Sequence, residues 1–188
     1  VTGPAIVAAN HSSTLDPLAV GIGSRRRLVR FLIAREYYQL PLLKYFFAAM
    51  GFIPVDRSGG DITSARAAMQ ALKNGDVVGI FPEGDIGDGL MLRHGQNGAA
   101  MLALATGAPV IPVYIAGTHP HESLKWDLLQ PARVRVYYGA PLTFGGLAEH
   151  RKDHAVLDEV TRQIMEAIAK LKSRADAARG DLAIKAAR

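Results

Sequence analysis

The sequence is organised around the stretch AIVAANHSSTLDP, residues 5–17. Its apolar run, Ala5 to Ala9, is typical of a short buried strand. Asp16 followed by Pro17 favours a helix start, because aspartate is common near N-caps and proline at the first helical position. The turn between strand and helix therefore carries His11 and Asp16 five positions apart. A carboxylate so placed can hold and aim an imidazole.

Short apolar strands alternate with helical segments along the rest of the chain. Strands are predicted at residues 5–9, 28–34, 52–55, 77–81, 110–115 and 134–138, and helices at 17–24, 40–50, 61–73, 97–106 and 153–174. A glycine-rich loop is expected at 82–95 and a frayed tail or short terminal helix within 175–188. This alternation predicts the α/β class, with a mostly parallel central sheet and helices on both faces.

Composition limits the classes of protein to consider. A chain of 188 residues, 49% of them hydrophobic, fits one domain with a sizeable core. The net charge of +5 suits an anionic partner. The absence of cysteine excludes disulfides and thiolate chemistry, and no apolar run reaches the roughly 18–20 residues of a membrane span. Because Val1 stands directly before a strand, we expect a preceding segment, and with it a membrane anchor, to be missing.

His11 and Asp16 suit general-base chemistry. A histidine titrates near neutral pH, and a neighbouring carboxylate fixes its tautomer. The chain has no Gly-x-Ser-x-Gly elbow, so a serine nucleophile is not indicated. The simpler interpretation is that His11 takes a proton directly from a substrate hydroxyl. The alternative, from this pair alone, is a capped helix beside an exposed histidine.

Three later strand ends also carry candidate site residues. Arg57, beside a glycine-rich turn, suits phosphate binding, although a surface ion pair with Asp56 is the simpler alternative. Glu83 follows a buried strand, where it orients a substrate or pairs with Arg57, or else is a solvated turn residue. Pro112 lies in a strand with two flanking prolines, which suggests an edge lining an apolar cavity, or a plain core strand.

Four motifs follow in order, each after a short strand: Asn-His-x4-Asp from Asn10, Gly-x4-Asp-Arg from Gly51, Phe-Pro-Glu-Gly from Phe81 and Val-Ile-Pro-Val from Val110. Together they resemble the glycerolipid acyltransferase family, whose best-known members are the lysophosphatidic acid acyltransferases. The resemblance covers about Ala5 to Thr118.

The resemblance implies acyl transfer from acyl-CoA or acyl carrier protein to a hydroxyl of a lipid acceptor, with no acyl-enzyme. His11 is implied as the general base and Asp16 as the residue that orients it. The substrate-binding residues are then expected to be Asn10, Arg57, Glu83, Gly84, Arg93 and Pro112. No cofactor is expected, and His11 with Asp16 makes too few ligands for a zinc site.

The chain departs from the family after Phe-Pro-Glu-Gly. The usual continuation Thr-Arg-Ser supplies a second phosphate-binding cation, but here the residues are Asp85-Ile86-Gly87. Arg93 and His94 lie close by in sequence and compensate if the acceptor is phosphorylated. An aspartate beside a phosphate is electrostatically unfavourable. A different, unphosphorylated lipid or polyol acceptor is therefore an alternative.

The sequence also predicts contact with an anionic membrane surface. Arg25, Arg26, Arg27 and Arg30 form a basic cluster, and the helix at 40–50 is aromatic and apolar. We expect peripheral attachment at the cytoplasmic face, unless these aromatics are core residues and the arginines a solvated turn. Two other classes stay open: a thioesterase or hydrolase, and a basic lipid-binding module. No nucleic-acid partner is expected, because no nucleic-acid-binding motif is present and the cations are scattered.

Overall fold

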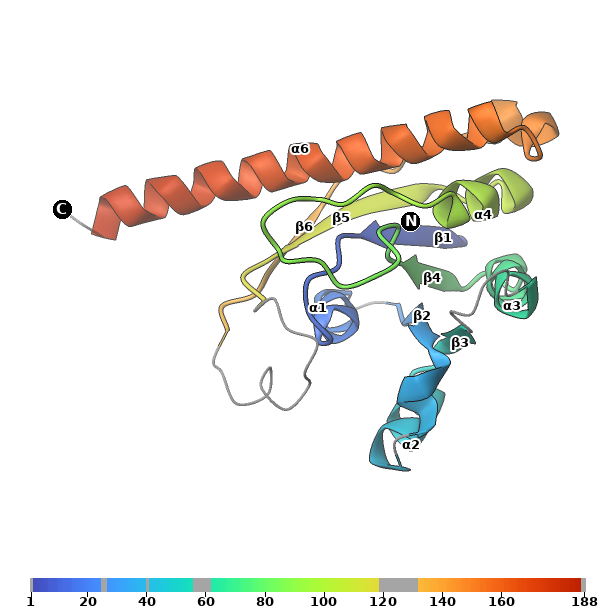
Figure 1. Ribbon diagram of the computed structural model, residues 1–188, viewed down its shortest axis with the longest axis horizontal. Helices are drawn as coiled ribbons and strands as arrows, with labels where there is room; N and C mark the ends of the chain where they lie inside the picture. The colour runs from blue at the N-terminus through green and yellow to red at the C-terminus, as the bar shows by residue number, and fades with distance from the viewer. Residues whose placement is uncertain (1, 25–26, 40, 56–61, 119–131, 187–188) are drawn as a thin grey trace.

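The computed structural model describes residues 2–24, 27–39, 41–55, 62–118 and 132–186 (Figure 1). Within these residues, six strands form one sheet with the order β3-β2-β4-β1-β5-β6. The strands are β1 (Ala5–Ala9), β2 (Val29–Ala34), β3 (Ile53–Val55), β4 (Val77–Ile80), β5 (Val110–Ala116) and β6 (Arg135–Tyr138). Every neighbouring pair is parallel except β5 with β6. The predicted mostly parallel sheet is therefore confirmed.

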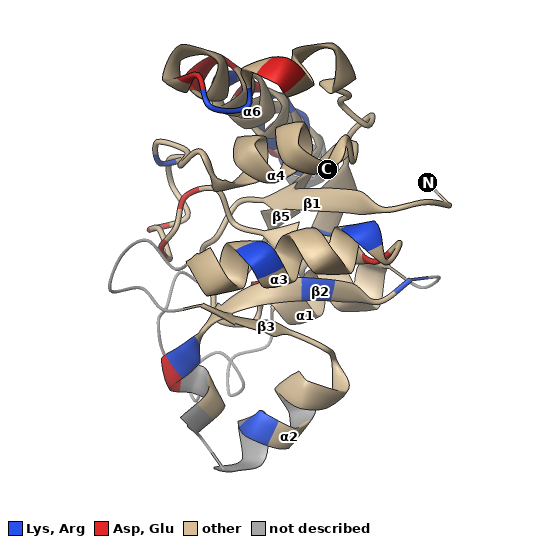
Figure 2. Ribbon diagram, turned by 90° about the vertical axis from the view of Figure 1, so that its right-hand side faces the viewer, with Lys and Arg blue, Asp and Glu red and all other residues tan. Residues whose placement is uncertain are grey.

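Helices cover both faces of this sheet. They are α1 (Asp16–Gly23), α2 (Pro41–Ala49), α3 (Ile62–Lys73), α4 (Gly98–Thr106) and α6 (His154–Ala186), with short 3₁₀ helices at Arg35–Gln39 and Gly145–His150. Side chains alternate along β1: Ile6 and Ala8 pack with α3, α4 and α6, whereas Val7 packs with α1 and α2. Figures 1 and 2 place α2 and α6 at opposite ends of the molecule.

The predicted helices and strands are present with ends shifted by at most one residue, with one exception. Helix α6 does not end at Arg174 but continues to Ala186, so residues 175–186 are helical. Ala175 is buried and extends the apolar spacing of Ile168 and Leu171. The alanine-rich sequence that follows has high helix propensity, and the helix passes through Gly180 without ending there.

Two arginines of the predicted membrane-binding cluster have structural partners instead. We call the edge where the parallel strands begin the amino edge. There Arg27 donates hydrogen bonds to the carbonyl oxygens of Thr2, Gly3 and Gly75. Arg30, in β2, donates to the carbonyl of Gly51 and forms an ion pair with Asp76. These contacts join segments that precede four neighbouring strands. Arg25 and Arg26 lie outside the described residues.

The aromatic helix α2 is only partly a core element. Phe47 packs on Phe52, with ring centroids 5.6 Å apart, and on Tyr38. Tyr45 and Lys44, in contrast, are exposed. Among the described residues, no helix is both long and apolar enough to cross a membrane.

Candidate active site

The first predicted motif lies at the carboxyl edge of the sheet, where the parallel strands end. His11 follows β1, Glu83 follows β4 and Thr118 follows β5, and these three strands are neighbours. Residues far apart in sequence therefore meet at one edge, as is general for open α/β sheets.

His11 is held by Asp16. The His11 Nδ1 lies 3.0 Å from Asp16 Oδ2, and the same oxygen accepts the backbone N–H groups of Ser12 at 2.7 Å and Ser13 at 2.8 Å. Asp16 is fully buried, and its Oδ1 has no hydrogen-bond partner in the described part of the chain. The carboxylate thus ties the turn to the imidazole. With Nδ1–H donating to this carboxylate, Nε2 is left as the acceptor.

The helix start differs in detail from the predicted cap. Leu15 stands at the N-cap of α1 without a side-chain hydrogen bond, and Asp16 is the first helical residue. Its side chain turns back into the preceding loop, because three donors converge on Oδ2 there. The aspartate therefore acts on the histidine turn and not on the helix end.

An aromatic stack fixes the plane of the imidazole. His11 lies parallel to Phe81, with ring centroids 4.0 Å apart and planes 10° apart. Phe81 in turn stacks on the fully buried Phe31 at 5.0 Å. The His11 side chain is 11% exposed, so the ring is largely enclosed but still reaches solvent. Aromatic packing of this kind restricts the ring to one orientation. Sequence reasoning did not identify Phe81 as a site residue, although it belongs to the Phe-Pro-Glu-Gly motif.

Glu83 braces two loops. Its Oε1 accepts the backbone N–H of His11 at 3.0 Å, and its Oε2 accepts that of Arg93 at 2.8 Å. The side chain is buried. Gly84 follows at φ +80°, in the left-handed region, and a Cβ there would collide with the Gln96 side chain. Both residues therefore shape the loop that faces His11.

Asn10 ties the end of β1 to β5. Its Oδ1 accepts the backbone N–H of Ile115 at 2.7 Å, and its Nδ2 donates to the carbonyl of the same residue at 3.2 Å. The hydroxyls of Ser12 and Thr118 are 2.9 Å apart. The turn that carries His11 is thus anchored to β5 on one side and, through Glu83, to the β4 loop on the other.

The remaining predicted residues are distributed unevenly. Arg57 lies outside the described residues. Arg93 is exposed, and its side chain approaches Gly87, whose backbone N–H donates to the His11 carbonyl at 2.8 Å. Pro112 is buried within β5, paired with Ala8 and packed against Gly139, away from the carboxyl edge. The structure therefore brings Asn10, His11, Asp16, Glu83, Gly84 and Arg93 together and leaves Pro112 in the sheet.

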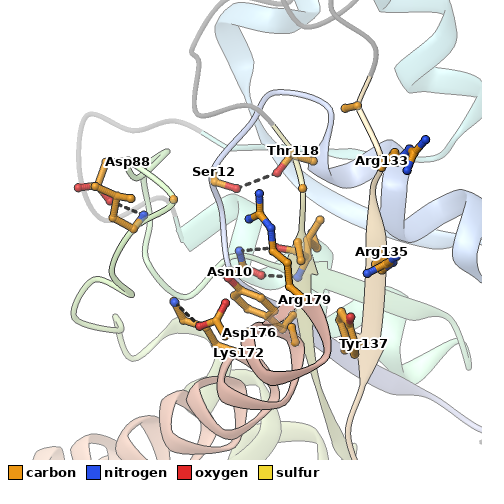
Figure 3. Close-up of a pocket in the computed structure, with 18 residues that line it drawn as sticks. Asn10, Ser12, Asp88, Thr118, Arg133, Arg135, Tyr137, Lys172, Asp176 and Arg179 are labelled. Atoms are coloured by element: carbon orange, nitrogen blue, oxygen red, sulfur yellow. Dashed lines mark hydrogen bonds and ion pairs between the residues drawn. The ribbon is translucent and has the colours of Figure 1, made fainter. Parts of the chain in front are cut away.

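A cavity of about 750 Å³ opens beside the histidine turn (Figure 3). Asn10 and Ser12, which flank His11 in sequence, form one part of its wall. The rest comes from the loop at 88–90, the end of β5, the start of β6 and the C-terminal half of α6. Its charged lining residues are Asp88, Arg133, Arg135, Lys172, Asp176 and Arg179. We call this cavity the cationic pocket. Pro112 does not line it.

Sequence reasoning missed the basic residues of the cationic pocket. Because β6 is antiparallel to β5, its beginning lies at the carboxyl edge, with Arg135 opposite Ala116. Arg133 and Arg135 therefore stand at the beginning of a strand, where a pattern of residues that follow strands does not include them. On α6, spacing from Lys172 to Asp176 and Arg179 puts these residues on one face. This spacing would have indicated a charged helix face if α6 had been predicted to extend to Ala186.

Three groups in the cationic pocket have shifted pKa values. The hydrogen bond to Asp176, at 2.8 Å, raises the pKa of Lys172. Burial raises the pKa of the Tyr114 hydroxyl. Backbone N–H groups of Leu90 and Met91 lower the pKa of Asp88. At neutral pH the lysine is therefore cationic, the tyrosine neutral and the aspartate anionic. Among the described residues, no group of three or more His, Cys, Asp or Glu side chains is arranged to hold a metal ion.

Comparison with known proteins assigns this arrangement to a family. Residues 1–116 match the family model described as Acyltransferase. The 1-acyl-sn-glycerol-3-phosphate acyltransferase of Bacillus subtilis is 24% identical over 172 residues, which cover 91% of this chain and 82% of that protein. The enzyme of the same name from Borreliella burgdorferi is 30% identical over 118 residues, 61% of this chain and 46% of that protein.

A solved structure agrees with the sequence comparisons. The chain is similar to the 1-acyl-sn-glycerophosphate (LPA) acyltransferase PlsC from Thermotoga maritima, with a TM-score of 0.62 and 26% identity, over 88% of this chain and 67% of that one. Because the family model covers more than half of the residues and the fold agrees, this chain belongs to the acyltransferase family, in its PlsC-like branch.

Proposed function

We propose that the chain transfers a fatty acyl group from acyl-CoA or acyl carrier protein to the hydroxyl of a lysophosphatidate-like glycerolipid. The names of the relatives support the reaction class and the acceptor. The observation that carries the mechanism is the 3.0 Å hydrogen bond between His11 Nδ1 and the buried Asp16 carboxylate. It leaves Nε2 of a fixed imidazole as the proton acceptor.

The reaction follows from this arrangement. Nε2 of His11 removes the proton from the acceptor hydroxyl while the hydroxyl oxygen attacks the carbonyl carbon of the thioester. Asp16 stabilises the imidazolium that forms. The tetrahedral intermediate then collapses, the C–S bond breaks, and the imidazolium returns the proton to the thiolate. The products are the new ester and the free thiol, and the histidine is regenerated.

The hydroxyl contacts of the turn support direct transfer without an acyl-enzyme. The Ser12 hydroxyl bonds to Thr118, and the Ser13 hydroxyl accepts the backbone N–H of Leu15 at 3.1 Å. A nucleophilic serine needs its hydroxyl directed at the base. The Ser12 hydroxyl is instead paired with the Thr118 hydroxyl at the end of β5.

The acceptor head group has two candidates, one phosphorylated and one not. The loop after β4 carries Asp85 and Asp88 close to the position where the family's usual sequence supplies a cation for a phosphate, and Arg93 is the arginine within that loop. For this reason an unphosphorylated acceptor, such as a monoacylglycerol, is the alternative substrate to be tested beside lysophosphatidate.

We also propose that the chain acts at the cytoplasmic face of an anionic membrane. The support is α2, which carries the exposed Tyr45 and Lys44 and lies at the end of the molecule opposite α6 (Figure 2). An aromatic and basic helix of this kind suits the lipid–water interface. Arg27 and Arg30 add no support for this surface, because their guanidinium groups bond to backbone carbonyls and to Asp76. Co-sedimentation with anionic vesicles tests it: Tyr45→Glu is expected to weaken binding, and unchanged binding would remove α2 from the proposal.

Measuring thiol release from acyl-CoA tests the reaction. His11→Ala is expected to lower kcat by about 10²–10⁴-fold, the usual contribution of a general base. His154→Ala, an exposed histidine at the start of α6, is the matched control and keeps wild-type activity. Unchanged kcat in His11→Ala would refute the mechanism.

Product analysis separates the remaining alternatives. Lysophosphatidate and monoacylglycerol are offered separately, and ester and free fatty acid are quantified. Ester formed from lysophosphatidate alone supports the proposed acceptor, and ester from monoacylglycerol supports the alternative. Fatty acid released at the same rate without any acceptor identifies a thioesterase and overturns the proposal.

A further inference from the structure

The cationic pocket has the size and position of a substrate site. Its volume of about 750 Å³ falls in the range of ligand cavities in proteins, roughly 300–1,000 Å³. Two of its lining residues, Asn10 and Ser12, are the chain neighbours of His11, whose own side chain is not part of the lining. The cavity therefore adjoins the turn that carries the base.

The charged lining of the pocket is positive overall. Lys172 is paired with Asp176, and Asp88, which accepts backbone N–H groups, is the other anion of the lining. Arg133, Arg135 and Arg179 have no hydrogen-bond or ion-pair partner within the described ranges of the chain. Three guanidinium groups without partners, around one cavity, favour an anionic ligand.

These arginines come from two separate walls. Figure 3 shows Arg133 and Arg135 on the segment that enters β6, and Lys172, Asp176 and Arg179 on α6. In the same view the Arg179 side chain extends from α6 toward the end of β1, where Asn10 and Ser12 lie. A ligand between the walls can be bound by guanidinium groups from both.

The backbone is shaped to bring one wall into place. Gly117, just after β5, has φ +87°, and a Cβ at this position would collide with the carbonyl oxygen of Arg133. A residue without a Cβ is therefore required where the two segments approach. This close approach sets Arg133 and Arg135 at the carboxyl edge beside Thr118.

We propose that the cationic pocket binds a phosphate group of a substrate, through Arg133, Arg135 and Arg179. Guanidinium groups bind phosphate oxygens in a bidentate way that a single carboxylate-paired lysine does not reproduce. This inference rests on the proposed function, in which both substrates can carry phosphate. The phosphate belongs either to the lysophosphatidate head group or to the nucleotide part of coenzyme A.

Steady-state kinetics on the whole chain tests the pocket. Arg133→Gln, Arg135→Gln and Arg179→Gln are made singly and together, and KM is measured for lysophosphatidate and for acyl-CoA, each with the other saturating. Each loss of a charged hydrogen bond is expected to raise one of the two KM values about tenfold, with kcat close to wild type. Arg174→Gln, an exposed arginine on α6 outside the pocket, is the control.

The KM values for the two substrates identify which of them supplies the phosphate. A higher KM for lysophosphatidate alone assigns the pocket to the acceptor, and a higher KM for acyl-CoA alone assigns it to the donor. Unchanged KM values for both substrates in the triple variant would overturn the proposal, as would an equal effect of Arg174→Gln. Arg179→Lys is expected to recover part of the affinity, which separates charge from packing.

Direct binding separates this proposal from the proposed reaction. Calorimetric titration of the wild-type chain and the triple variant uses coenzyme A and glycerol 3-phosphate as probes, at low and high salt. Arginine-dependent binding by a protein that transfers no acyl group would refute the reaction but support the pocket. No binding of either probe to the wild-type chain would overturn the pocket. Circular dichroism of each variant verifies folding, and the single variants serve if the triple variant does not fold.

Discussion

Arginines lie at both edges of the same sheet, but their surroundings differ. At the amino edge, Arg27 and Arg30 bind backbone carbonyls and an aspartate, and they join the segments that precede the strands. At the carboxyl edge, Arg133, Arg135 and Arg179 line a cavity, and no described side chain or carbonyl accepts from their guanidinium groups. The same residue type therefore has two different roles.

The difference shows how partners distinguish a structural cation from one that binds a ligand. An arginine whose donors are already used by carbonyls contributes to stability, and its removal leaves acceptors unsatisfied. An arginine without partners keeps its donors for a ligand, and its removal changes binding more than stability. Variants at the two edges should therefore separate into those that affect the reaction and those that affect unfolding.

The largest expected effect is at the carboxyl edge, on the residue that aims the base. Asp16→Asn can keep an acceptor for the backbone N–H groups of Ser12 and Ser13 but removes the charge beside His11. We expect kcat to fall by about 10²–10⁴-fold with KM little changed. Rapid-quench or thiol-release kinetics measures the effect, and near-normal kcat would contradict the aiming role.

The Asp16→Ala variant separates catalysis from folding at this residue. It leaves the two backbone N–H groups without their acceptor, so the free energy of unfolding should also fall by about 2–4 kcal/mol. Urea unfolding of the two variants makes the comparison. Equal stabilities for Asp16→Asn and Asp16→Ala would show that the hydrogen bonds to the turn contribute little.

At the amino edge we expect a loss of stability without a kinetic change. Arg27→Met removes the donors to the Thr2, Gly3 and Gly75 carbonyls and should lower the free energy of unfolding by about 1–3 kcal/mol. Neither KM should move. Arg66→Met, exposed on α3, is the control. A changed KM in Arg27→Met would mean that the two edges are not separate in function.

A glycine gives a smaller effect on the active-site side. Gly84→Ala forces a side chain into a left-handed conformation and against Gln96, which should lower the free energy of unfolding by about 1–2 kcal/mol. Adding Gln96→Ala is expected to recover the loss of stability caused by the collision. The loss caused by the left-handed backbone conformation should remain. Thermal unfolding checks this, and a stable Gly84→Ala variant would contradict the strain argument.

The smallest effect is expected for the partly exposed ion pair of Arg30 with Asp76, whose atoms are 2.6 Å apart. A double-mutant cycle of Arg30→Gln and Asp76→Asn should give a coupling free energy of about 0.2–1 kcal/mol. This energy should decrease at high salt because the pair reaches solvent. A coupling that does not depend on salt would show that the pair is more shielded than its exposure indicates.

Much of the fold was predictable because its signals are local. Apolar runs such as Ala5–Ala9 and Val77–Ile80 indicate buried strands. Because amphipathic helices separate these strands along the chain, the pattern predicts a parallel sheet. The end of α6 was not predictable in the same way. Gly180 resembles a helix end in sequence, whereas burial of Ala175 continues the packing of α6 on β5.

The candidate site likewise has features that depend on local spacing and features that depend on tertiary contacts. His11 and Asp16 are five residues apart, so one turn can hold both, and the sequence predicted their pairing. Arg27 and Arg30 were predicted at a membrane surface, because a sequence shows the charge of an arginine but not the carbonyls that surround it. The role of Glu83 as a brace between His11 and Arg93 likewise depends on contacts across the sheet.

The sequence by itself determined the α/β alternation and the histidine turn, since both depend on spacing within one or two elements. Only the tertiary structure decided which basic residues surround the site. The antiparallel direction of β6 brings Arg133 and Arg135 to the carboxyl edge, and the length of α6 adds Arg179. Strand direction and helix length depend on packing between distant segments, because each element must bury its apolar face against the others.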